Sequence, residues 1–231
     1  MSDENQKFDR TALNRMLIAM FAMVALMFAV SLYAWFTLPS DIRIPVHWGI
    51  NGEPNRFASK AAGLMMMPGT MLFIVGVLAV IPIIEPRRQN LLRSFVAYRM
   101  IGLSLMAFLL LLHLATIANL EGYIKLKMTS VTGLLMSALI MMMGNYLGKV
   151  RSNFMFGIRT PWTLSSNVAW DRTHRLGGRL FFLTGLAGVI LSVTLPHLGM
   201  KICIALLLAC SAYLVFYSWF VWRTAPDRQV R

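Results

Sequence analysis

Six long apolar runs constrain the fold of this chain more than any other feature. Each run has about 18 or more residues, and about 20 helical residues at 1.5 Å each cross a hydrocarbon core about 30 Å thick. Backbone groups in lipid must form hydrogen bonds within their own segment, so each run is expected to be a helix. We therefore predict an all-α, polytopic membrane protein with six transmembrane helices. The runs are Met16–Leu38, Ala61–Ile84, Met100–Ala118, Met128–Leu147, Leu176–Leu195 and Ile202–Val221.

Composition and charge agree with this class. The residues are 58% hydrophobic and only 13% charged, about half the charged fraction of a soluble domain. A net charge of +13 would suggest nucleic-acid binding in a soluble protein. Here, however, fifteen Lys and Arg residues fall in the two termini and two of the connections, against six in the three alternate connections. This positive-inside pattern predicts that both termini are cytoplasmic, and it argues against direct nucleic-acid binding.

The chain is expected to form one membrane domain with two three-helix halves. Residues 1–15 are expected to be a cytoplasmic tail, residues 16–118 the N-terminal half and residues 119–231 the second half. The first apolar run is too long for the core of a signal peptide, and no small-x-small cleavage site follows it. We therefore expect this run to remain in the protein.

The loop 39–60, on the outside in this topology, is expected to be ordered. Its apolar residues alternate in the manner of a strand, namely Ile42, Ile44, Val46 and Trp48. Asn51-Gly52 is a turn signal, and Pro54 follows it. These features predict a hairpin-like cap, although Pro39, Pro45 and Pro54 restrict any sheet to edge strands.

Most of the residues that can carry chemistry lie in a block at 148–178, between the fourth and fifth runs. Gly157 permits a tight bend where the chain leaves the fourth helix. Pro161 fixes its own φ and biases Thr160 away from helix, so a turn or an extended corner is expected here. Thr163 or Ser165 can then cap a new helix that begins near residue 166.

In that new helix Trp170 and His174 share a face, as do Asp171 and Arg175, which could form a surface ion pair. Gly177-Gly178 indicates a kink, or the point where an interfacial helix turns into the bilayer. Two interpretations of the block stay open. It is either a membrane-interface segment with Trp and Arg at the headgroups, or an ordered polar pocket at the mouth of the bundle.

Two residues carry specific expectations. Gly157 and Pro161 bracket Arg159 with bend-forming residues that a simple headgroup anchor does not need. We therefore expect its planar guanidinium to form a fork onto a fixed carboxylate, a carbonyl pair or a ligand phosphate. His113 is the one ionisable residue well inside an expected helix, which makes it a functional candidate. A neutral imidazole bonded to a neighbouring helix is the simpler interpretation.

The sequence contains no catalytic or metal-binding pattern. The four histidines, at positions 47, 113, 174 and 197, are scattered over different expected compartments, and the nine acids lie mostly in loops. There is no His-Glu-x-x-His, no phosphate-cradling loop and no nucleophile elbow. We expect neither an enzyme nor a bound metal or cofactor.

The stretch Gly157–Leu164, with Val168, Trp170 and Thr173–Gly178, resembles the signature of the SdpI family of bacterial membrane proteins, and Gly148–Asn153 fits it too. The outside loop resembles an uncharacterised domain that is often fused before that signature. The resemblance implies an SdpI-like second half and functional residues at Asn153, Gly157, Arg159, Thr160, Pro161, Trp162, Thr163, Trp170, Thr173, His174 and Gly178 and, in the outside loop, at Pro39, Pro45, His47, Gly52 and Lys60.

The resemblance also implies a function. The type member of the family protects the producing cell from a secreted membrane-active peptide toxin, and it relays the presence of toxin by drawing a cytoplasmic repressor to the membrane. We accordingly expect an immunity protein of the bacterial cytoplasmic membrane, whose partners are the lipid bilayer, a peptide toxin and a cytoplasmic transcriptional repressor. Three alternatives stay open: a membrane sensor alone, a transporter of a small anion or peptide that uses Arg159 and His113, and an enzyme acting on lipid headgroups.

Overall fold

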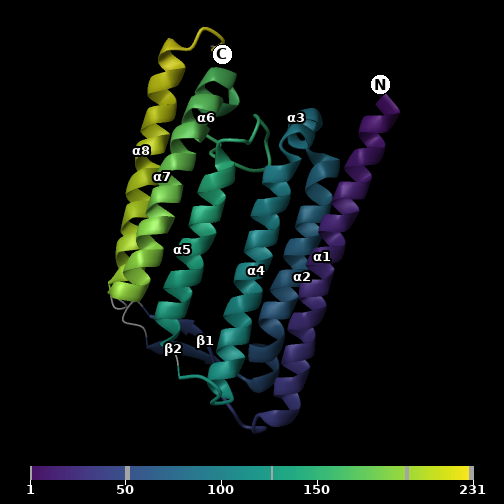
Figure 1. Ribbon diagram of the computed structural model, residues 1–231, viewed down its shortest axis with the longest axis vertical. Helices are drawn as coiled ribbons and strands as arrows, with labels where there is room; N and C mark the ends of the chain where they lie inside the picture. Colours follow the sequence, from purple (N-terminus) through teal and green to yellow (C-terminus); the bar gives the residue numbers. More distant parts are fainter. Residues whose placement is uncertain (1, 50–52, 126, 196–197, 229–231) are drawn as a thin grey trace.

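The computed structural model describes residues 2–49, 53–125, 127–195 and 198–228, and it shows six long helices side by side (Figure 1). Each of them contains a stretch that is long and apolar enough to cross a membrane. The predicted all-α fold with six membrane-spanning helices is therefore confirmed. The long helices are α1 (Ser2–Thr37), α2 (Lys60–Ile84), α4 (Phe95–Leu120), α5 (Met128–Leu147), α7 (Asn167–Thr194) and α8 (Gly199–Thr224), and the short ones are α3 (Arg88–Arg93) and α6 (Pro161–Leu164).

Consecutive long helices run in opposite directions (Figure 1). We call the end of the bundle where α1 begins and α8 ends the terminal end, and it also holds α3 and α6 (Figure 1). The opposite end, with strands β1 and β2, is the hairpin end. The positive-inside pattern predicts that the terminal end faces the cytoplasm.

Helices α1 and α7 extend furthest beyond the apolar runs. Helix α1 reaches back to Ser2 through most of the expected tail, and α7 begins at Asn167, nine residues before the expected fifth span. Because α7 continues unbroken through Gly177-Gly178, the expected change from an interfacial helix to a separate span does not occur there. A side chain on Gly178 would approach the carbonyl oxygen of Gly144 to 2.8 Å, so this glycine allows α5 to pack closely on α7.

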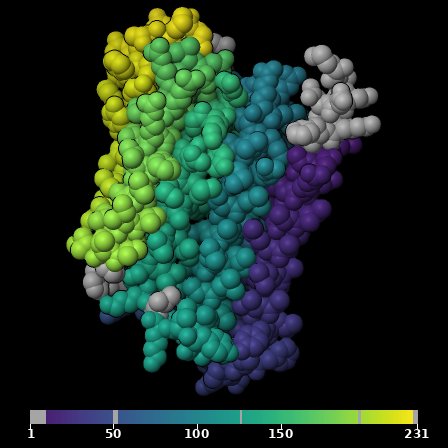
Figure 2. Space-filling view, in the orientation of Figure 1, coloured from purple at the N-terminus to yellow at the C-terminus, as the bar shows by residue number. Residues whose placement is uncertain are grey.

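The first three long helices pack through a core that is rich in methionine. Met16, Met20 and Met27 of α1 meet Met71 of α2 and Met106 of α4, and all five are at most 1% exposed. Flexible thioethers fill such irregular spaces well. Helix α4 also packs against α5, so the two sets of three helices are in contact along the face seen in Figure 2.

At the hairpin end, β1 (Ile44–Trp48) and β2 (Pro54–Ala58) form an antiparallel sheet, which confirms the predicted hairpin-like cap. Ile44 is 2% exposed, and a side chain on Gly63 of α2 would lie 2.6 Å from its Cβ. The hairpin is therefore seated directly on the helices. The expected Asn51-Gly52 turn, including the candidate site residue Gly52, lies outside the described residues.

Candidate functional site

The first part of the predicted functional block forms a loop at the terminal end, and the rest of the block forms α6 and the start of α7. We call residues 148–160, between α5 and α6, the signature loop (Figure 1). Asn153 is fully buried, and its Oδ1 accepts hydrogen bonds from the backbone N–H groups of Met155 (2.9 Å) and Phe156 (2.8 Å). Its Nδ2 donates to the carbonyl of Arg151 (2.9 Å). The turn thus uses both the acceptor and the donor of an amide side chain.

A carboxylate from α2 holds the middle of the signature loop. Glu85 caps the C-terminus of α2, is 3% exposed, and accepts the Phe154 N–H through both oxygens, at 3.2 and 3.0 Å. It also accepts the N–H of Arg87 at 2.8 Å. Hydrogen bonds to a charged acceptor are stronger than neutral ones. Glu85 was not predicted as a site residue, and its one signal in the sequence is that no other acid lies between Glu53 and Glu121.

Arg87 and α3 clamp the same loop from the side. The Arg87 guanidinium donates to the hydroxyl of Ser152 and to the carbonyl of Leu164 (3.0 Å), and its Cζ lies 4.6 Å from the centre of the Phe154 ring. Asn90 of α3 donates to the carbonyl of Ser152 at 2.8 Å. Sequence reasoning missed both residues. The segment from the end of α2 into α3 therefore holds the signature loop in place, although it lies outside the signature itself.

Trp170 and His174 form a fully buried pair on α7. Their rings stack with centroids 4.0 Å apart and planes 15° apart, which confirms the predicted shared face. Trp170 Nε1 donates to the carbonyl of Val150 (2.7 Å), and His174 Nε2 accepts the backbone N–H of Ile158 (2.9 Å). The other ring nitrogen, Nδ1, lies 2.9 Å from the carbonyl of Trp170. These partners assign a neutral imidazole with its proton on Nδ1, and both rings bind the backbone of the loop.

Gly157 makes this arrangement possible. Its φ is +113°, a conformation that residues with a side chain rarely adopt. A Cβ at this position would lie 2.5 Å from His174 Nε2 and 3.3 Å from the Trp170 ring. The predicted bend is therefore present, and it requires glycine for two separate reasons, backbone conformation and space.

Residues Pro161–Leu164 form the short helix α6, which was not among the predicted elements. Thr160 is extended, at φ −106° and ψ 161°, as predicted, and it caps α6 in a reciprocal pair with Thr163. Pro161 occupies the first turn, where its missing N–H costs nothing. The Thr160 hydroxyl also lies 3.0 Å from that of Ser218 on α8. Trp162 is half-buried in the same turn.

Ser166, rather than Thr163 or Ser165, caps α7, so this part of the prediction was wrong. Its Oγ accepts the Ala169 N–H at 3.0 Å and donates to Asp227 at 2.6 Å. Asp227 also accepts the N–H of Asn167 at 2.8 Å. Desolvation raises the pKa of Asp227, but the hydrogen bonds from Ser166 and the first turn of α7 outweigh it and hold the pKa below its usual value.

Within the described part of the chain Arg159 forms no fork onto a carboxylate or a carbonyl pair, and the alternative of a ligand phosphate stays a prediction. Its side chain is exposed, and Nη1 donates once, to the carbonyl of Phe154 at 2.7 Å. The two-partner geometry belongs instead to Arg87. Asp171 pairs with Arg151 at 3.8 Å, with both side chains largely exposed, and not with Arg175 as expected. The spacing of Asp171 and Arg175 along α7 did not reveal that Arg151 of the signature loop lies within reach of Asp171.

Thr173 is fully buried in α7, beside this cluster in sequence. Among the described residues, its hydroxyl oxygen is one of three buried side-chain polar atoms that have no hydrogen-bond partner. The sequence resemblance singled out this residue, but the structure assigns it no contact that explains a role.

His113 lies apart from the signature loop, toward the hairpin end of α4. It is 3% exposed, and its Nε2 lies 2.9 Å from the hydroxyl of Ser31, which donates to the carbonyl of Leu64 at 2.9 Å. The hydroxyl proton is used in that second bond, so His113 is the donor to Ser31. The three residues join α4, α1 and α2, as the packing interpretation expects. His113 and Arg159 do not share a site.

The candidate residues of the outside loop surround the hairpin. Lys60 donates to the carbonyl of Leu38 at 2.5 Å and lies 5.4 Å from the centre of the Trp35 ring. His47 is exposed, with Nδ1 2.7 Å from Asn55 Oδ1, and Pro39 is exposed near the end of α1. A pocket of about 270 Å³ separates the hairpin from the ends of α4 and α5, and its lining includes Pro45, Trp48, Pro54, Asn119 and Lys127. We call it the hairpin pocket.

Two family models match separate parts of the chain. The SdpI/YfhL protein family matches residues 149–221, from the signature loop into α8, and DUF1648, a domain of unknown function, matches residues 22–72, including the hairpin. Immunity protein SdpI of Bacillus subtilis (strain 168) is 25% identical over 169 residues, which are 73% of this chain and 77% of that protein. No solved structure matches. The chain is therefore a multi-pass membrane protein that is similar to the SdpI/YfhL family in its C-terminal part and to that domain of unknown function in its N-terminal part.

Proposed function

We propose that this chain is an immunity protein of the bacterial cytoplasmic membrane, which protects the cell from a secreted membrane-active peptide toxin. The observation that carries the proposal is the similarity to an immunity protein over most of both chains. Such a protein acts by binding, so it does not need a nucleophile, a metal or a cofactor. It needs a surface that a peptide arriving from outside can reach.

The hairpin pocket supplies that surface. In the predicted topology it opens outward, and Pro45, Trp48 and Pro54 give it apolar walls, while Asn119 and Lys127 add a polar amide and a cation. Its volume of about 270 Å³ is below the range typical of whole small-molecule sites, but it suits a single large side chain of a peptide. Aromatic residues are common anchors at such contacts.

The test is protection of a sensitive bacterium that expresses the protein, measured against a panel of secreted membrane-active peptides. We expect tolerance to at least one peptide to rise. Trp48→Ala should abolish this protection, whereas Phe57→Ala, which removes an exposed ring from the same hairpin but outside the pocket, should retain it. Unchanged sensitivity across the panel, with the protein confirmed in the membrane, would contradict immunity. Equal protection by both variants would contradict the role of the pocket.

A second activity, toxin sensing by sequestration of a cytoplasmic repressor, is favoured by one observation. Helix α2 begins at Lys60, two residues after the end of β2, and its C-cap is Glu85, which binds the signature loop at the terminal end. A shift of α2 at the hairpin would therefore reach a loop that is cytoplasmic in the predicted topology. If a small helix-turn-helix repressor is encoded beside this gene, the measurement is membrane fractionation of that repressor with and without the peptide. Glu85→Ala should reduce recruitment at constant membrane abundance, and recruitment that is independent of both peptide and Glu85 would rule the proposal out.

A further inference from the structure

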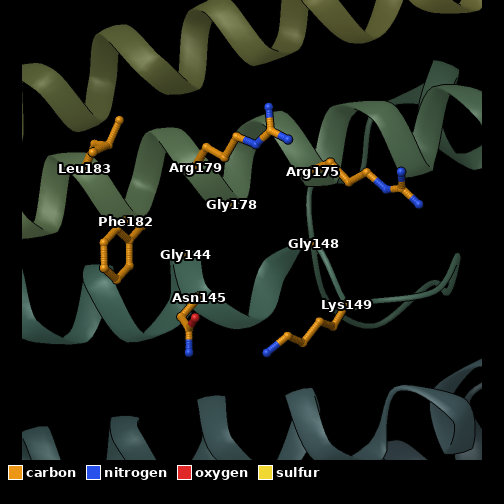
Figure 3. A pocket seen from close by; sticks show the side chains of 9 residues that line it. All are labelled: Gly144, Asn145, Gly148, Lys149, Arg175, Gly178, Arg179, Phe182 and Leu183. Carbon is orange, nitrogen blue, oxygen red and sulfur yellow. The ribbon is translucent and has the colours of Figure 1, made fainter.

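A second cavity lies on the surface of the bundle, away from the hairpin. It is an open groove of about 560 Å³ along the α5–α7 contact, near the terminal end (Figure 3). Gly144, Gly148 and Gly178 line it, so no side chain from these positions fills the space between the two helices. Because the two helices approach each other closely at these glycines, backbone atoms form the bottom of the groove. We call this cavity the α5–α7 groove.

Its charge is unbalanced. Lys149, Arg175 and Arg179 line the groove, and no acidic residue does. Arg175 and Arg179 are one helical turn apart on α7, where like charges repel each other. Within the described ranges neither guanidinium has an ion pair or a hydrogen bond, and the one acid on α7, Asp171, pairs with Arg151 instead. Among the described residues, the Lys149 ammonium contacts the face of the Tyr146 ring, 4.6 Å from its centre.

The polarity changes along the groove. The cations gather at the end toward the signature loop, and Phe182 and Leu183 lie at the other end, with the Phe182 ring directed toward α5 (Figure 3). Seven residues separate Arg175 from Phe182, or about 10.5 Å along the helix axis. The two apolar side chains are 38% and 59% exposed on a helix that spans the membrane. The groove therefore runs from a cationic head region to an apolar region open to lipid tails.

We propose that the α5–α7 groove binds the phosphodiester of an anionic phospholipid, with an acyl chain along Phe182 and Leu183. The phosphate would accept hydrogen bonds from Arg175 and Arg179 and neutralise their repulsion, and Lys149 would complete the cationic wall. A free phosphate would use only the charged end. The apolar end selects a lipid, and basic pockets between membrane helices are suited to anionic headgroups. This site is independent of the immunity proposal.

The test is native mass spectrometry of the full chain in detergent, titrated with phosphatidylglycerol, with phosphatidylcholine of the same acyl chains, or with inorganic phosphate. We expect phosphatidylglycerol to bind more tightly than either alternative. Arg179→Gln should weaken its binding about tenfold, the loss of a charge-assisted hydrogen bond. The matched control is Arg172→Gln, which removes the same charge from an exposed position on α7 outside the groove and should change binding less than about twofold.

A second variant tests the space without changing charge. Gly148 has φ −67° and ψ −7°, and the atom nearest to a Cβ there would be Arg175 Cα at 3.5 Å, an ordinary van der Waals distance, so a side chain can begin at this position without a backbone clash. Gly148→Leu should block phosphatidylglycerol binding at an unchanged melting temperature. Equal loss in Arg179→Gln and Arg172→Gln, or undiminished binding in Gly148→Leu, would overturn the groove as the site. Inorganic phosphate that binds as tightly as phosphatidylglycerol would overturn the assignment to a lipid.

Discussion

Gly157→Ala is expected to destabilise the protein more than the same substitution at a glycine that has a positive φ but open space for a Cβ. A positive φ costs a residue with a side chain about 1–2 kcal/mol. The new Cβ would also stand 2.5 Å from His174 Nε2, and that ring is held by its stack on Trp170. If the ring moves, the N–H of Ile158 loses its acceptor, which costs about 1–3 kcal/mol for a buried donor. The total is about 2–5 kcal/mol.

Gly122→Ala is the matched control. Its φ is +79°, and a Cβ there meets nothing within 4 Å, so only the backbone cost of about 1–2 kcal/mol applies. The assay is thermal unfolding in detergent, in which the extra destabilisation of Gly157→Ala corresponds to a melting point roughly 2–12 °C below that of Gly122→Ala. Adding His174→Ala removes the obstructing ring, so the double variant should be less destabilised than the sum of its two single variants. Equal effects of the two glycine substitutions, or strict additivity with His174→Ala, would refute the steric explanation.

Three further outcomes follow from the geometry. Arg87→Lys should destabilise the protein by about 1–3 kcal/mol because lysine cannot hold both hydrogen-bond partners, whereas Arg159→Lys should cost less than about 1 kcal/mol in the same unfolding assay. The folded pKa of Asp227 lies below its unfolded value, so its carboxylate stabilises the protein above the unfolded pKa and this contribution is lost as the pH falls through the folded pKa. Unfolding measured across pH 3–6, below and around the ordinary carboxyl pKa of about 4, should therefore show a steeper acid loss in the parent than in Asp227→Asn, and parallel curves would contradict it. In a background without the native cysteines, an impermeant thiol reagent on intact cells should label Arg56→Cys and not Ser165→Cys, and the reverse pattern would invert the predicted topology.

The sequence by itself determined the features that depend on short-range periodicity. Six apolar runs predicted six spans, because a hydrocarbon core admits only segments that satisfy their own backbone. Alternation around Ile44 predicted the hairpin, and the spacing of Trp170 and His174 predicted their shared face. Gly157 and Pro161 predicted the bend and the extended Thr160. Each of these follows from the backbone preferences of a few neighbouring residues.

Only the tertiary structure decided which segments these local features meet. Glu85 binds Phe154 across 69 positions and Ser166 binds Asp227 across 61, and no local pattern signals either contact. The Gly177-Gly178 pair looks the same in sequence whether it bends a helix or admits a neighbour, because that difference lies in α5. Gly157 and Pro161 flank Arg159 and suggested two hydrogen-bond partners for it, yet Arg159 donates to one carbonyl. Arg87 is the arginine that reaches two acceptors, on Ser152 and Leu164. Partners of polar groups are set by packing between distant segments, because a buried donor takes whichever acceptor the assembled helices bring within reach.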